Sequence, residues 1–159
     1  MTLSNRESCC SWSNSHEIYM EYHDLEWGKP EFNGKKLFEI LTLETFQSGL
    51  SWIIILKKRD NFRNAFDNFN PKAISKYNEK KVSELMENNL IVRNKKKILS
   101  TINNAKIYNN YFKKSEYFSD FFWSHVNHKP IVNSWKKLSD IPKDTALSKK
   151  ISENMKELG

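Results

Sequence analysis

Glycine, proline and cysteine are scarce in this chain. Its 159 residues include four glycines, four prolines and two cysteines. Turn-rich all-β folds need more glycine and proline than this, so the composition favours an all-α fold. The length suits one domain that spans residues 1–159 and has its own core. The hydrophobic share is only 38%, but aromatic residues reach 13%, and their bulk can fill a core with fewer side chains.

The sequence pattern also lacks a disulfide framework, a secretion signal and a membrane span. Its two cysteines, Cys9 and Cys10, are adjacent, and neighbouring cysteines make a poor structural disulfide. The first twenty residues have no apolar segment of the kind that directs secretion. The longest apolar run, residues 52–56, is far too short to cross a bilayer. We therefore expect a cytoplasmic protein with no membrane partner.

Acidic residues are fewer than basic residues. The chain has 26 Lys and Arg residues against 19 Asp and Glu residues, which gives a formal net charge of +7. This excess suits a polyanionic partner, with nucleic acid ahead of an anionic membrane surface. The alternative explanation is that the lysine and asparagine content reflects an AT-rich genome, and this does not exclude DNA binding.

Apolar spacing and capping residues predict about eight helices with short connections. Asn70 followed by Pro71 is typical of a helix start, and the other expected caps are Ser15, Asn78 and Ser115. Residues 1–8 are expected to form an N-terminal arm. The expected helical segments are 15–22, 35–48, 50–58, 60–69, 71–76, 78–86, 93–112, 115–126 and 144–158.

Glu44 stands out because it interrupts the apolar stripe of the predicted helix 35–48. Leu37, Ile40 and Leu41 are spaced so that they share its helix face. A buried carboxylate costs several kcal/mol unless it is paired. One interpretation is structural, with Glu44 capping backbone amides or pairing with a lysine. The other is functional, with Glu44 accepting hydrogen bonds from a ligand that carries amino groups.

Three aromatic residues, Tyr22, Trp27 and Trp52, are close to Glu44 in the sequence. Each alone is most simply a core residue. As a set beside a carboxylate they suggest a stacking pocket for a planar, cationic or amino-bearing base. Cation–π attraction in such a pocket is worth about 0.5–2 kcal/mol per ring face.

Two further groups of residues have a weaker pattern. Cys10 and His23 are ligand types that zinc prefers, but a structural zinc site needs four ligands, so they form half a site. A basic segment follows Asn89 and includes Arg93, Asn94 and Lys95, then Lys96 and Lys97. Helix N-terminal amides with lysines bind phosphate groups, and the alternative is a solvated basic turn. The sequence contains no Walker loop, GxSxG elbow or Cys-x-x-Cys pair.

At these residues the chain resembles the 3-methyladenine DNA glycosylase I family of the helix-hairpin-helix glycosylase superfamily. The resemblance covers nearly all of residues 7–159, and its markers are specific only in combination. They are Cys10-Ser-Trp12, Tyr19, Tyr22-His-Asp24, Glu26-Trp27-Gly28, Lys36-Leu-Phe38, Leu43-Glu44, Gly49-Leu-Ser-Trp52, Leu56-Lys-Lys-Arg59, Ile91-Val-Arg93, Trp123 and Val126-Asn127.

The resemblance implies an all-α, helix-hairpin-helix glycosylase-like domain. The implied activity is that of a monofunctional hydrolase, an N-glycosylase that flips and removes 3-methyladenine from alkylated double-stranded DNA without strand cleavage. It implies no organic cofactor and a monomer, and it assigns no catalytic residue. The implied base-binding residues are Glu44, Tyr22, Trp27, Trp52, Trp12 and Tyr19, and the implied DNA-binding residues are Asn89, Arg93, Asn94 and Lys95.

The chain departs from the family pattern in two respects. It carries Asn89 in the hairpin where relatives usually have glycine, and its zinc ligands are incomplete. Family members hold a structural zinc with ligands from both ends of the domain, and Cys10 and His23 match only the first pair. The second pair and a closing segment would follow Gly159, so the chain is C-terminally short by this comparison. An alternative expectation is therefore a truncated, non-catalytic DNA- or damage-binding remnant.

Overall fold

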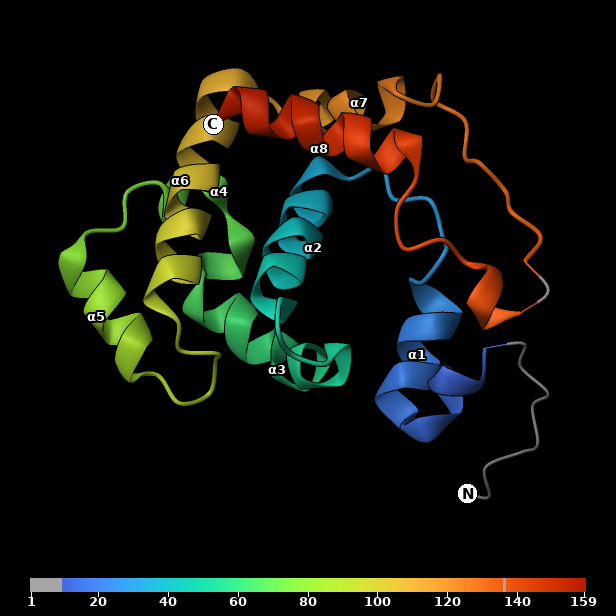
Figure 1. Ribbon diagram of the computed structural model, residues 1–159. Coiled ribbons are helices and arrows are strands. Elements are labelled where there is room, and N and C mark those ends of the chain that lie inside the picture. Colours follow the sequence, from blue (N-terminus) through green and yellow to red (C-terminus); the bar gives the residue numbers. More distant parts are fainter. Residues whose placement is uncertain (1–9, 136) are drawn as a thin grey trace.

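The computed structural model describes residues 10–135 and 137–159, so the expected N-terminal arm and Cys9 lie outside the described residues. The described part is helical, with no strand (Figure 1). This confirms the all-α prediction. The α-helices are α1 (Glu17–Leu25), α2 (Gly34–Gln47), α3 (Trp52–Ala65), α4 (Pro71–Ile74), α5 (Glu79–Glu87), α6 (Lys95–Tyr111), α7 (Ser115–Ser124) and α8 (Ala146–Leu158). Short 3-10 helices are η1 (Ser11–Ser15), η2 (Asp67–Phe69) and η3 (Leu138–Asp140).

Asparagine side chains start several of these helices. The Oδ1 atoms of Asn70 and Asn78 accept hydrogen bonds from backbone amides two and three residues later, both at 3.0 Å. Asn94 caps α6 in the same way. Such caps satisfy amides that have no partner within the helix. The predicted caps Asn70 and Asn78 are confirmed. The caps expected at Ser15 and Ser115 are wrong, because α1 follows His16 and α7 follows Lys114, and neither helix has a side-chain cap.

Helix α3 is longer than the sequence pattern predicts. Residues 52–65 form one helix, where two helices over 50–58 and 60–69 were expected. Its buried residues, Ile55, Arg59 and Phe62 among them, recur every three or four positions without a break in phase. The chain then turns through Asp67, Asn68 and Phe69, whose φ angles of 49°, 51° and 52° are left-handed. The segment therefore ends in the short left-handed turn η2 and not in a continued α-helix.

A phenylalanine-rich core surrounds α2. The largest fully buried side chains include Phe38 and Phe46 on α2, and Phe62 on α3. Helix α2 packs against α3, α6 and α7, which places it at the centre of the fold (Figure 1). Gly34 starts α2 so close to Ser115 of α7 that a β-carbon would overlap the Ser115 carbonyl group. The high aromatic content therefore builds the core, as predicted.

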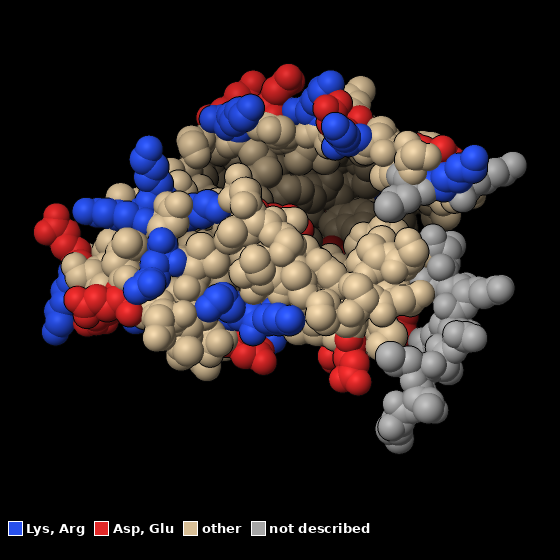
Figure 2. Space-filling view, turned by 60° about the horizontal axis from the view of Figure 1, so that its bottom comes forward, with Lys and Arg blue, Asp and Glu red and all other residues tan. Residues whose placement is uncertain are grey.

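Helices α1 and α8 lie at the periphery. Neither contains a fully buried residue. Figure 1 shows α8 crossing above α2 and α1 standing apart on one side, and Figure 2 shows that the molecule is hollowed below α8. Among the described residues, no helix has the length and apolar character needed to cross a membrane.

Candidate base-binding site

Glu44 lies on the α2 face that borders the hollow. The core face of α2 carries Phe38, Leu43 and Phe46, whereas Glu44 is exposed. The prediction that Glu44 is buried in an apolar stripe is therefore wrong. Its stripe partners Leu37 and Ile40 are only half-buried and line an apolar groove with residues of α7 and α8. Helix α2 thus has two apolar faces, and Glu44 belongs to the outer one.

The Glu44 carboxylate makes no ion pair or hydrogen bond with the described part of the chain. Although Glu44 as a whole is exposed, the surrounding atoms partly desolvate its carboxylate, and this raises its pKa above the ordinary value of 4.5. The lysine pair and backbone cap of the structural interpretation are absent from the described residues. The site therefore presents a partly desolvated carboxylate without a partner.

The five predicted aromatic residues form one cluster. The Trp12 ring centre lies 5.4 Å from that of Tyr19, 5.4 Å from that of Trp27 and 6.4 Å from that of Tyr22. Tyr22 in turn lies 5.6 Å from Trp52. The interplanar angles of 85°, 76°, 52° and 62° show that these rings meet at an angle rather than in parallel stacks. Angled packing covers at most one ring face in each of these pairs, whereas the His23 ring stacks in parallel on Trp27.

Tyr22 connects the aromatic cluster to the carboxylate. Burial raises the pKa of its hydroxyl group, and the negative charge of Glu44 raises it further. Tyr22 comes from α1 and Glu44 from α2, two helices that are separate in sequence. The fold therefore brings together the residues that the sequence analysis grouped.

Tyr19 and Trp52 fix the junction between α1 and α3. The Tyr19 hydroxyl oxygen accepts a hydrogen bond of 2.9 Å from the backbone amide of Ile53, near the start of α3. The buried indole Nε1 of Trp52 has no hydrogen-bond partner among the described residues, although it is close enough to Tyr22 to influence its pKa. Trp52 is thus held by ring packing against Tyr22.

A buried ionic network anchors α1 to the body of the protein. Arg59 donates to Glu26 at 2.6 Å and to Glu39 at 2.7 Å, and Arg63 also contacts Glu39 at 2.8 Å. Burial alone would raise the pKa of Glu26, but Arg59 outweighs it and holds that pKa below its usual value. The network joins the end of α1 to α2 and α3. It therefore positions Tyr22 and Trp27 relative to Glu44.

The connection between α5 and α6, residues 88–94, carries the predicted DNA-binding residues. Asn89, Arg93, Asn94 and Lys95 are all exposed. The Asn94 side chain also caps α6, with its Oδ1 atom 3.2 Å from the amide nitrogen of Lys97. The backbone at Asn89 is not left-handed, so asparagine is accommodated there without strain. These side chains project from one end of the helix pair.

Sequence comparison identifies the family. A family model described as methyladenine glycosylase matches residues 12–159. The chain belongs to this family. It is 47% identical over 150 residues to the DNA-3-methyladenine glycosylase of Haemophilus influenzae, covering 94% of this chain and 81% of the relative. It is 43% identical to DNA-3-methyladenine glycosylase 1 of Escherichia coli, covering 94% and 80%.

Solved structures agree with this assignment. A crystal structure of 3-methyladenine DNA glycosylase I superposes with a TM-score of 0.90 at 39% identity, covering 94% of this chain and 82% of that one. A tyrosine-to-phenylalanine variant of 3-methyladenine DNA glycosylase I in complex with 3-methyladenine has a TM-score of 0.89 at 32% identity, covering 94% of this chain and 81% of that one. A glutamate-to-glutamine variant from Staphylococcus aureus has a TM-score of 0.88 at 32% identity, also covering 94% and 81%.

The predicted zinc ligands do not form a metal site with the described residues. Cys10 is buried beside η1, whereas the His23 ring stacks on Trp27 at 5.4 Å and its Nδ1 lies 3.1 Å from Asp24. No group of three or more His, Cys, Asp and Glu side chains in the described ranges could hold a metal ion. The residues present therefore do not fit a complete zinc site.

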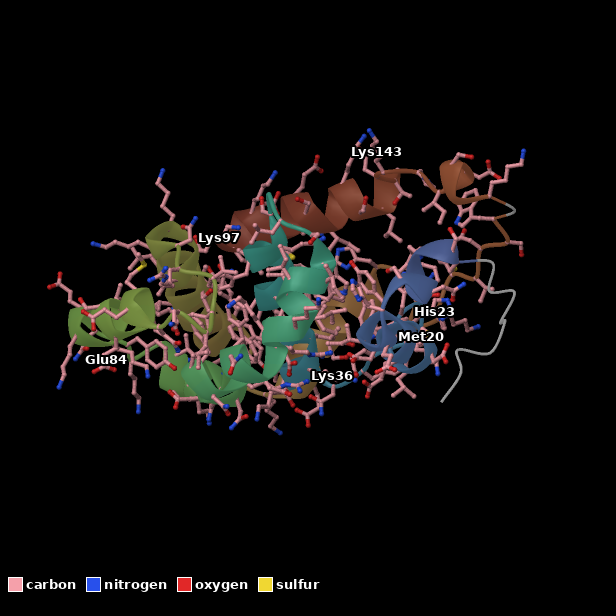
Figure 3. The ribbon with its side chains drawn as sticks, turned by 90° about the horizontal axis from the view of Figure 1, so that it is seen from below. Met20, His23, Lys36, Glu84, Lys97 and Lys143 are labelled. Carbon is pink, nitrogen blue, oxygen red and sulfur yellow. The ribbon has the colours of Figure 1, made fainter. Side chains whose placement is uncertain are left out.

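Two features of the site were missed by the sequence analysis. The Arg59 network joins residues that are 20 and 33 positions apart, and no spacing rule connects them. Lys97, predicted to face phosphate, instead reaches from α6 to the end of α2 (Figure 3). The position of Arg59 on a mostly apolar helix face was the sequence signal that could have indicated its ionic network.

Proposed function

We propose that this chain is a DNA N-glycosylase of base-excision repair, which removes 3-methyladenine from alkylated double-stranded DNA and leaves the strands intact. The observation that carries the proposal is the unpaired Glu44 carboxylate beside Tyr22 and its aromatic neighbours. Membership of the methyladenine glycosylase family supports it. The tyrosine and glutamate replaced in the two solved variants are numbered as far apart as Tyr22 and Glu44.

Recognition follows from charge and shape. Methylation at N3 gives the adenine ring of the nucleotide a positive charge. The extruded base stacks against Tyr22, Trp52 and the remaining rings, and cation–π attraction favours the charged base by about 0.5–2 kcal/mol per face. Glu44 accepts hydrogen bonds from the amino edge of the base. Ordinary adenine lacks the charge, so it binds less tightly and remains in the duplex.

The chemistry needs little acid catalysis. When the N-glycosidic bond breaks, its electron pair moves to the cationic base, which leaves as neutral 3-methyladenine. The oxygen of a water molecule bonds to C1′ of the sugar and loses a proton to the solvent. The DNA phosphates stabilise the cationic sugar as it forms. The protein contributes by extracting the nucleotide and holding its base, and we assign no residue to orient the water.

In this proposal the protein binds the DNA backbone beside the pocket. Helices α5 and α6 with the 88–94 connection form the helix-hairpin-helix unit, and its exposed side chains Asn89, Arg93, Asn94 and Lys95 face the phosphates. Figure 2 shows Lys and Arg side chains along the α8 rim of the hollow and on the α5–α6 side. We propose a monomer that acts in the cytoplasm, where its DNA substrate lies.

Base release is the direct test. Purified protein in excess over methylated duplex DNA should release 3-methyladenine, detected by chromatography with mass spectrometry, and the same DNA should stay uncut on a denaturing gel. Salt-dependent binding to the duplex without any base release would contradict the enzymatic proposal and favour the DNA-binding remnant instead. Strand cleavage would contradict the monofunctional assignment.

A further inference from the structure

Two lysine side chains near the proposed DNA grip are turned toward the protein. Lys97 Nζ donates hydrogen bonds to the carbonyl oxygens of Phe46 at 2.9 Å and Ser48 at 2.6 Å. Lys58 Nζ donates to the carbonyl oxygens of Asn89 at 3.2 Å and Leu90 at 2.9 Å. Each ammonium group therefore has two hydrogen-bond partners within the protein, unlike an exposed lysine that is free to bind phosphate.

Lys97 closes the carboxyl end of α2. The last carbonyl groups of a helix lack internal partners and form the negative end of its dipole, so a lysine there is favourable. Glu44 is in the same last turn of α2. Lys97 itself belongs to the first turn of α6, directly after the 88–94 connection. It therefore links the start of α6 to the helix that carries the candidate base-binding carboxylate.

Lys58 makes a second link from the opposite direction. It belongs to α3, the helix that begins at Trp52. Its two acceptors lie within the 88–94 connection itself, and its side chain is half-buried. Helices α2 and α3, which carry Glu44 and Trp52, are thus hydrogen-bonded to the segment that contacts DNA in the proposed function.

We infer that Lys58 and Lys97 are positioning residues, which hold the 88–94 connection at a fixed distance from Glu44 and Trp52. The inference rests on the proposed function, because a base flipped from a duplex must enter the pocket while the connection grips the same duplex. A misplacement of about 1 Å far from the reacting atoms can reduce a rate by about 100-fold. Neither lysine is a phosphate ligand in this account.

The test compares Lys58→Met and Lys97→Met with the wild-type chain. Methionine keeps the apolar stem and removes the ammonium group. Single-turnover excision is expected to fall by about 10- to 100-fold, whereas the affinity for free 3-methyladenine and the salt dependence of duplex binding stay unchanged. Lys97→Arg, which can also donate to two carbonyl groups, should recover most of the rate.

Two other lysines provide controls. Lys95→Met removes an exposed side chain of the proposed DNA grip and should lower the slope of log affinity against log salt by about 0.9. Lys106→Met alters an exposed residue further along α6 and should change none of the measured quantities. All variants are compared at a temperature where circular dichroism shows that they are folded, and Lys58→Leu, which also lacks the ammonium group, replaces Lys58→Met if the latter does not fold.

Several results would overturn the inference. A slope reduced by about 0.9 in Lys97→Met would identify Lys97 as a phosphate ligand. Wild-type excision rates in both methionine variants would show that neither lysine positions the connection. An equal loss of free-base affinity would show that the pocket itself had collapsed. If the wild-type chain releases no base, the proposed function fails instead, and the salt slope still decides whether Lys97 faces DNA or protein.

Discussion

Replacing Glu44 with glutamine separates its role in binding from any role in folding. Glu44→Gln keeps the side-chain length and removes the negative charge. The free carboxylate has no cationic partner among the described residues, and burial raises its pKa. Its charge therefore destabilises the unliganded protein slightly and becomes favourable only when a cationic base is present.

The effect on excision follows from the lost interactions. A hydrogen bond to a charged group contributes about 1.5–3 kcal/mol and a neutral one about 0.5–1.5 kcal/mol. Coulomb attraction to the cationic base adds to this difference, although partial exposure of Glu44 weakens it. A total loss of about 2–3 kcal/mol corresponds to roughly 30- to 150-fold slower excision. The assay is single-turnover release of 3-methyladenine from methylated duplex DNA.

The effect on stability has the opposite sign. Because the folded-state pKa of Glu44 is raised, its ionisation penalty appears as the pH rises from the ordinary value of 4.5 through the folded-state pKa, and it persists above. At pH 7 the glutamine variant should be at least as stable as the wild type, within about 0.5 kcal/mol. The difference in stability between the variant and the wild type should vanish at acidic pH. Normal excision together with a stability loss above about 2 kcal/mol would refute this reasoning, because it would make Glu44 a structural residue.

Substitutions at four other positions test the pocket, the ionic network and the backbone. Tyr22→Ala should weaken binding of free 3-methyladenine by about 1–3 kcal/mol, measured by calorimetry, whereas Tyr22→Phe should retain most of the affinity because the ring remains. Arg59→Met should lower the free energy of unfolding in urea by about 3 kcal/mol, because it leaves two glutamates without their buried partner; an unchanged midpoint would contradict the anchoring role. Gly34→Ala should cost more than about 2 kcal/mol by the same measurement, since its methyl group overlaps a backbone carbonyl of α7. Asn68→Ala should cost about 1 kcal/mol because its φ angle is left-handed, and Asn68→Gly should not.

Local chemistry made most helix positions predictable. Asn70 and Asn78 cap helices because a short side-chain carbonyl reaches the free amides of the first turn, and this interaction needs no tertiary context. The break expected near Asp60 was wrong because a polar stretch on the outer face of a helix resembles a loop in sequence. The apolar positions Ile55 and Phe62 kept their phase across it.

The placement of charged side chains was harder to predict. Glu44 lies on an apolar stripe, but that stripe borders the hollow, and sequence periodicity does not distinguish a core face from the wall of a groove. Lys97 and Arg59 were assigned no internal role, since their partners come from distant parts of the chain. The aromatic cluster was predictable as a set because its members lie near one another in sequence.

The titration of the Glu44 carboxyl group tests the central claim most directly. Carbon-13 labelling of glutamate side chains allows its pKa to be followed by NMR, with Glu44→Gln identifying the signal. We expect a pKa above 4.5 in the free protein, and a downward shift when 3-methyladenine binds among the rings. A pKa at or below 4.5 that does not change with the ligand would contradict the claim that Glu44 is an unpaired receptor for the alkylated base.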